Sequence, residues 1–223
     1  MKQKIWPILL IAILLFIPLG FIQNQINYET VADNLQTNLV LMPGEAGDMV
    51  LAGFKGIAAD LLWINVENYW HRGEHFKMIP LFYMVTLLQP HWILAWSLGG
   101  WHMAYNVPAG VKNIQGKYYW YQQGIQFLKK GVSYNSSRYD LYFETGWTYY
   151  NKGEDYSNAV KYLKQAVIYP GPDYVKDVLA HAYEKDGHIN QAIKEWKKLL
   201  HTDFKGVAKR MIYDLNTRGW ATP

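Results

Sequence analysis

Matching residues recur at a spacing of 34 along this chain, and this period limits its fold more than any other feature. The identical pairs are Gly153 and Gly187, and Tyr149 and Tyr183. Leu62 and Trp96, and Val66 and Gly100, are upstream pairs with the same spacing. A period of this length is typical of a two-helix unit, which cannot bury its apolar face alone and stacks on its neighbours. No run of alternating apolar residues indicates a large sheet. The period therefore predicts an all-α array of helical hairpins.

Four such repeats account for residues 59–202. The first begins at Ala59, and the later ones begin at Ile93, near Tyr139 and near Asp173. Residues 107–117 have no counterpart in the other repeats, and we expect them to lengthen the turn between the two helices of repeat two. Residues 203–223 are predicted to form a capping helix and a tail, because a solenoid needs a polar outer face at its end.

Small and aromatic residues at fixed offsets in these repeats resemble the pattern of the tetratricopeptide repeat (TPR) superfamily. Repeat three shows the pattern with Gly146, Tyr149, Gly153, Ala159 and Pro170. The resemblance covers most of the repeat region and is weakest in repeat two, where the insertion lies. It implies a solenoid of helical hairpins. The strings GWHMAYN, YNSSRYDLYFETGW and FKGIAADLLW also resemble a group of bacterial membrane-anchored TPR proteins of unassigned role.

An uncharged apolar run stands at the amino terminus, at residues 5–22. Its length is close to the ~20 residues that a helix needs to cross a bilayer. Lys2 and Lys4 precede it and the first charges after it are acidic, so the positive-inside rule keeps the amino terminus in the cytoplasm. We expect residues 1–25 to be a transmembrane signal anchor and residues 26–58 a juxtamembrane connector. The protein would then be single-pass in the inner (cytoplasmic) membrane, with an extracytoplasmic carboxy-terminal domain.

Two other interpretations of this run stay open. A cleaved signal peptide is one, although the run is longer than the usual apolar region of such peptides and no small-x-small cleavage site follows it. A buried core helix is the other.

In TPR arrays the inner face of the first helix of each repeat lines a concave groove, and the resemblance implies the same role for the matching positions here. These groove residues are Trp63, Glu67, Trp70, Trp101, Tyr105, Phe143, Trp147, Tyr150 and His181. Most are aromatic, and Trp and Tyr anchor many protein interfaces. The other interpretation is that they pack between neighbouring helices. Lys and Arg are nearly absent from the groove, which argues against a clamp for acidic carboxy-terminal peptides.

Composition and motifs argue against catalysis, metal binding and nucleic-acid binding. The chain has no Cys, no P-loop, no dinucleotide fingerprint and no nucleophile elbow. His71 and His75 have the spacing of metal ligands on a helix, but Gly73 lies between them, so we expect solvated turn residues. A net charge of +4 is too small to indicate nucleic acid by itself. We therefore expect no catalytic residue, no metal site and no cofactor.

These features predict a membrane-anchored extracytoplasmic scaffold that binds a protein or peptide partner in a bacterial cell-envelope, secretion or surface-filament assembly. It would contact the lipid bilayer through residues 5–22 and the partner through the groove. Two alternatives stay open. One is a glycan-binding envelope protein, with sugars stacked on the aromatic groove. The other is a structural subunit that self-associates as a homo-oligomer through its aromatic face.

Overall fold

The structure is a computed structural model that describes residue 18 and residues 45–219. Within these residues every regular element is a helix, as the all-α expectation requires. The expected anchor at residues 1–25, apart from Pro18, and residues 26–44 of the expected connector lie outside the described part. None of the described helices is both long enough and apolar enough to span a bilayer. The helices divide into two compact units, at residues 45–95 and 96–219.

The first unit is a hairpin of α2 (Glu45–His71) and α3 (His75–Leu88), joined to the start of α4 (Ile93–Trp101). Gly73 makes the turn with a φ of 69°, a left-handed conformation that glycine adopts at no steric cost. Ala59, Val85 and Ala95 form the centre of its core. The helix α2 runs through residue 59, where the sequence analysis places the start of the first repeat.

The outer face of α3 is apolar although it faces solvent. Phe76, Tyr83, Met84 and Leu87 are all exposed on it, and Leu87 retains 78% of its accessible surface. The opposite face carries the buried residues of the same helix, so α3 is apolar all round. A helix of this kind is ordinarily covered on both sides.

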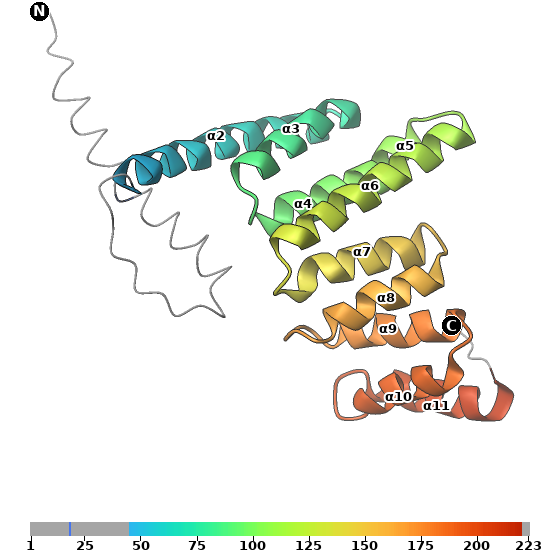
Figure 1. Cartoon of the computed structure of the whole chain (residues 1–223). Coiled ribbons are helices and arrows are strands. Elements are labelled where there is room, and N and C mark those ends of the chain that lie inside the picture. Colours follow the sequence, from blue (N-terminus) through green and yellow to red (C-terminus); the bar gives the residue numbers. More distant parts are fainter. Residues whose placement is uncertain (1–17, 19–44, 220–223) are drawn as a thin grey trace, which may run out of the picture. The chain divides into compact units, whose positions relative to one another are not determined.

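The second unit is built of successive helical hairpins (Figure 1). Its elements after α4 are the π-helix η1 (His102–Asn106), α5 (Val107–Ala109), α6 (Ile114–Tyr134), α7 (Tyr139–Asn151), α8 (Tyr156–Ala166), α9 (Tyr174–Lys185), α10 (Ile189–Lys198) and α11 (Lys205–Arg218). The helix α7 packs on α8 and α9 packs on α10, while α6–α7 and α8–α9 contacts join one hairpin to the next. The helix α11 lies where the sequence predicts the capping helix, and its Met211 and Leu215 pack on the buried Trp196.

The expected long turn in repeat two is wrong, because most of residues 107–117 are helical. Val107 continues the first helix as α5, and α6 already begins at Ile114, so only residues 110–113 form the turn. Val107 and Pro108 are buried, which holds α5 against α6. The Asn113 side chain caps α6 by accepting a hydrogen bond from the backbone N–H of Gly116 at 2.6 Å. The insertion therefore lengthens both helices of the hairpin instead of its turn.

Glycine lets the two long helices of this hairpin approach each other closely. A Cβ added at Gly124 of α6 would lie 2.7 Å from the carbonyl oxygen of Gly100 and 2.9 Å from the amide nitrogen of Ala104. Both of these neighbours are backbone atoms, which cannot move aside as a flexible side chain would. Gly124 is therefore required by packing, although glycine costs about 1 kcal/mol in a helix interior.

We expect Gly124→Ala to lower the free energy of unfolding by about 1–3 kcal/mol, because the added methyl overpacks the contact with Gly100. Gly206→Ala is the matched control: Gly206 lies in α11 with no atom within 4 Å of an added Cβ, so this change should stabilise the protein by about 0.5–1 kcal/mol. Urea unfolding followed by circular dichroism measures both changes. Equal stabilisation in the two variants would show that α6 does not approach α4 as described.

Candidate functional site

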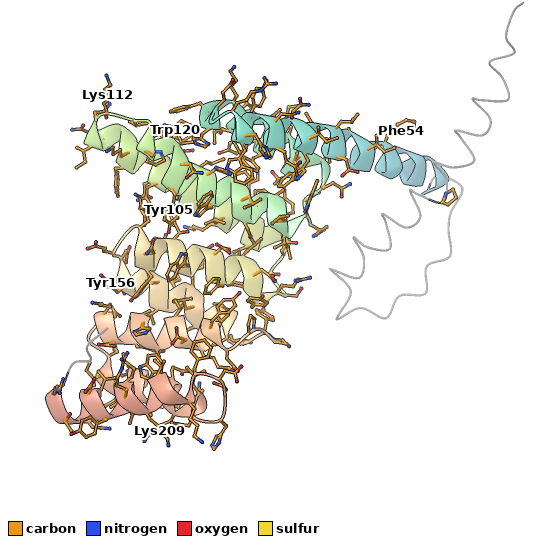
Figure 2. All side chains as sticks on the ribbon, turned by 180° about the vertical axis from the view of Figure 1, so that it is seen from behind. Phe54, Tyr105, Lys112, Trp120, Tyr156 and Lys209 are labelled. Carbon is orange, nitrogen blue, oxygen red and sulfur yellow. The ribbon has the colours of Figure 1, made fainter. Side chains whose placement is uncertain are left out.

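The first helices of repeats two, three and four lie next to one another in the second unit. The Tyr105 hydroxyl of η1 donates a hydrogen bond to Oδ1 of Asn151 in α7, at 3.2 Å. The Phe143 ring of α7 packs edge-on against the Tyr174 ring of α9, with 5.0 Å between centroids. Figure 2 shows Tyr105 on the side of its hairpin that faces α7. We call the side chains that these helices share the helix-A surface, which consists of Trp101, Tyr105, Asp140, Phe143, Glu144, Trp147, Tyr150, Tyr174, Asp177, His181 and Glu184.

Stacked aromatic rings run along this surface. Phe143 stacks on Trp147 with 6.4 Å between centroids, and Trp147 stacks on Tyr150 at 5.8 Å. Residues three and four apart share one face of a helix, which is why these rings meet. Trp101 and Tyr105 repeat the arrangement on α4 and η1, at 6.0 Å. Pairs of this kind contribute about 0.5–1.5 kcal/mol each beyond the area that they bury.

The rings of the helix-A surface remain accessible. Trp101 is 38% exposed, while Tyr105, Phe143, Trp147 and Tyr150 are half-buried. Each of these rings therefore packs against neighbouring side chains with part of its surface and contacts solvent with the rest. A partner could cover what remains exposed without first rearranging the rings.

His181 sits at the α9 edge of the surface. Its ring packs edge-on against the buried Trp196 indole, with 4.9 Å between centroids, and its Nδ1 lies 3.7 Å from a carboxylate oxygen of Glu184. The half-buried imidazole is thus partly a packing element of the α9–α10 hairpin.

Three predicted groove residues belong to α2 in the first unit. Trp63 packs against Trp92 at 4.8 Å between centroids and donates a hydrogen bond from Nε1 to the Glu67 carboxylate at 2.9 Å. Trp70 is 52% exposed near the end of α2. Of these residues, Trp63 contributes to the core of its own hairpin, while Glu67 and Trp70 are at the surface.

The helix-A surface also carries four carboxylates, those of Asp140, Glu144, Asp177 and Glu184, and of these the mapping of the groove onto the sequence missed only Glu144. Glu144 is the most perturbed, because burial, and secondarily the Asp140 charge, raise its pKa to about 7. Its carboxylate has no hydrogen-bond or ion-pair partner among the residues that the structure describes. A signal was available in the sequence, since Asp140, Glu144, Trp147 and Asn151 follow the spacing of one helix face.

The two tyrosines that flank Glu144 stay neutral at physiological pH. Burial raises the pKa of Tyr105 to about 12, although a hydrogen bond with Thr148 opposes the shift. Burial and hydrogen bonding with Tyr139 raise the pKa of Tyr174 to about 12. In both cases the Glu144 charge adds to the increase.

The helix-A surface offers binding contacts: flat aromatic faces, phenol donors and carboxylate acceptors. In the described residues, no group of three or more His, Asp or Glu side chains is arranged to hold a metal ion. His71 and His75 stand on either side of the Gly73 turn, at the end of α2 and the start of α3.

Comparison with known proteins shows the fold. No protein-family model matches the chain, and no curated protein matches it in sequence. Among solved structures, a thermophilic TPR protein of Thermus thermophilus is similar over 87% of this chain and 96% of its own length, with a TM-score of 0.52 and 15% identity. The chain therefore has a TPR-like helical repeat fold, which confirms the solenoid that the sequence resemblance predicts.

The raised pKa of Glu144 predicts a pH-dependent stability. Its carboxyl has an ordinary pKa of 4.5 in the unfolded chain and about 7 in the folded protein, so folding binds a proton between these values. Stability therefore falls as pH rises from 4.5 through 7. Glu144→Gln removes this loss, and we expect the variant to exceed the native protein by about 1–3 kcal/mol at pH 8 and to match it near pH 4.5.

Urea unfolding at the two pH values measures this difference. Glu154→Gln serves as the control, because Glu154 is an exposed residue of the α7–α8 turn. It should leave the pH dependence of the native protein unchanged. A Glu144→Gln variant with the native pH profile would contradict the described burial of the carboxylate.

Proposed function

We propose that this protein is a membrane-anchored extracytoplasmic TPR scaffold that binds a peptide segment of a protein partner on its helix-A surface. The observation that carries the proposal is the set of stacked, partly exposed rings on two neighbouring helices, Trp101 and Tyr105 on the continuous α4–η1 helix and Phe143, Trp147 and Tyr150 on α7. The assembly that it serves would be one of the bacterial cell envelope, of secretion or of surface filaments.

The TPR-like fold supports a general role in holding protein partners. Large aromatic side chains dominate the binding energy of protein interfaces, because they lose much accessible surface and little conformational freedom. The rings of the helix-A surface are already ordered by mutual stacking, so binding costs little further side-chain entropy. An extended or helical peptide is the shape that lies across three parallel helix faces.

Attachment to the inner membrane rests on the sequence of residues 5–22 and on the two lysines before it. Anchoring confines scaffold and partner to one surface, which raises the local concentration of each for the other. A modest affinity at the helix-A surface would then suffice for stable association.

The peptide-binding role is tested by crosslinked pull-down from intact membranes with the full chain and with a Trp101→Ala/Trp147→Ala variant. We expect one partner to be captured by the native chain and lost, by at least about tenfold, in the variant, because both rings are anchors. Tyr118→Ala/Tyr213→Ala removes two exposed rings outside the helix-A surface and should capture the partner normally. Loss of the chain's own copies alone would indicate self-association, and unchanged capture would contradict the proposal.

Membrane topology is tested with single cysteines, since the chain has none of its own. We expect a membrane-impermeant maleimide to label Lys209→Cys in intact spheroplasts and to label Lys2→Cys only after lysis. Lys209 is exposed on α11, so its reaction needs no unfolding. Labelling of Lys209→Cys only after lysis would place the repeats in the cytoplasm and contradict the extracytoplasmic part of the proposal.

A further inference from the structure

We infer that the outer face of α3 contacts the surface of the lipid bilayer, in addition to the contact made by the apolar run at residues 5–22. We call this face the α3 stripe. It consists of Phe76, Pro80, Tyr83, Met84 and Leu87, all of which are exposed in the structure. The inference rests on the proposed membrane attachment and adds a second site of contact with lipid, within the first repeat.

Helical spacing makes the α3 stripe one continuous surface. Each member lies three or four residues from the next along the helix, and residues at these intervals share one face. The opposite face forms the core of the hairpin: Phe82 packs edge-on against Trp63 of α2 at 6.0 Å between centroids, and Val85 is buried beside Ala59. The stripe is therefore not needed to hold α3 against α2.

The lack of charge distinguishes this stripe from the other exposed helix faces. No Asp, Glu, Lys or Arg occurs from residue 78 to residue 111. On α2, the exposed Leu61 and Ile64 stand beside exposed polar residues such as Asn65. The exposed residues of α10 are all polar, namely Asn190, Gln191, Lys194, Lys197 and Lys198. A helix that is apolar all round, as α3 is, ordinarily has apolar surroundings on both sides.

The chain itself brings a bilayer within reach of this stripe. Residues 23–44 separate the apolar run from Glu45, where α2 begins, and this length of chain spans at most about 75 Å when fully extended. An anchored chain therefore holds the α3 stripe permanently near the lipid surface. Under such confinement even a weak apolar contact is occupied, because the effective concentration of its partner is high.

Side chains suited to the headgroup region stand at the amino-terminal end of the stripe. Trp70 at the end of α2 and Lys77 in the first turn of α3 are both exposed. The Lys77 ammonium lies 5.5 Å from the centroid of the Tyr69 ring and pairs with Glu74. Tryptophan is enriched where lipid meets water, and lysine keeps its charge in water while its alkyl chain lies along apolar surface. The turn at Gly73 thus has the composition of a membrane–water boundary.

The size of the stripe argues against a second copy of the chain as its occupant. A helix of 14 residues is about 21 Å long and about 10 Å wide, so one face of α3 offers on the order of 200 Å². A stable protein interface buries about 800 Å² on each partner. Contact with the bilayer needs no such area, because the anchor already supplies the attachment.

The test places a fluorescent probe on the stripe of the full chain, reconstituted into phosphatidylcholine vesicles. Because the chain has no Cys, Leu87→Cys and the control Asn68→Cys each accept a single nitrobenzoxadiazole label. Leu87 and Asn68 are both exposed and belong to the same hairpin, so one anchor holds both probes near the membrane. The vesicles are prepared with and without a lipid that carries a nitroxide quencher in its acyl chain.

We expect the quencher to reduce the emission of the probe at position 87 about twofold or more and to leave that at position 68 nearly unchanged, because only the stripe enters the apolar layer. Met84→Glu in the chain labelled at position 87 should abolish the quenching, since a charge is costly in lipid. Met84→Leu should retain it. Met84 is exposed, so neither change disturbs the core of the hairpin.

Flotation of the vesicles after an alkaline carbonate wash separates two kinds of failure. A chain that does not float with the vesicles contradicts the proposed membrane attachment itself. If the chain floats but the probe at position 87 is quenched no more than that at position 68, or if quenching persists in Met84→Glu, the α3 contact is overturned and the attachment stands. Energy transfer between labelled chains without quenching from lipid would place a second copy on the stripe and overturn the inference as well.

Discussion

The second unit depends on one close contact between backbones, that of Gly124 in α6 with Gly100 in α4. At this point no side chain separates the two helices, and on either side of it buried side chains such as Trp96 and Leu128 pack between them. Its first helix presents Trp101 and Tyr105 along one edge. The hydrogen bond from Tyr105 to Asn151 then fixes α7 beside that edge, and the Phe143–Tyr174 contact fixes α9 beside α7. These contacts together fix the positions of the helices that form the helix-A surface.

This packing explains how one surface combines aromatic rings with a buried carboxyl group. Burial of the Glu144 carboxyl in the middle of α7 raises its pKa, on the same helix face that carries the stacked rings of Phe143 and Trp147. The same helix would be more stable with a neutral residue there. Structures that keep a costly group in a well-packed setting often do so at a functional site, because the cost is recovered when a ligand binds.

The sequence alone predicted the repeats well, because the period of 34 recurs in several repeats and remains detectable although repeat two contains an insertion. It failed at residues 107–117, where Gly110 and Gly116 suggest a turn but burial of Val107 and the Asn113 cap favour helix. Among the predicted site residues, the rings from Trp101 to Tyr150 do lie together. Glu144 was missed because a lone carboxylate in a helix usually faces solvent. The burial of this one, which raises its pKa to about 7, is a property of the folded chain.

The hairpins of the second unit touch only their neighbours in the chain, as contacts pass from α6 to α7, from α8 to α9 and from α10 to α11. Elements connected in this way carry a mechanical load in series. A pull between the amino-terminal side of the unit and α9 passes through the α6–α7 junction, and none of it is shared with α10 or α11. Such a pull also passes through the α8–α9 junction, so the weaker of the two junctions sets the strength of the whole. Helices beyond α9 add stability to the array without adding resistance to such a force.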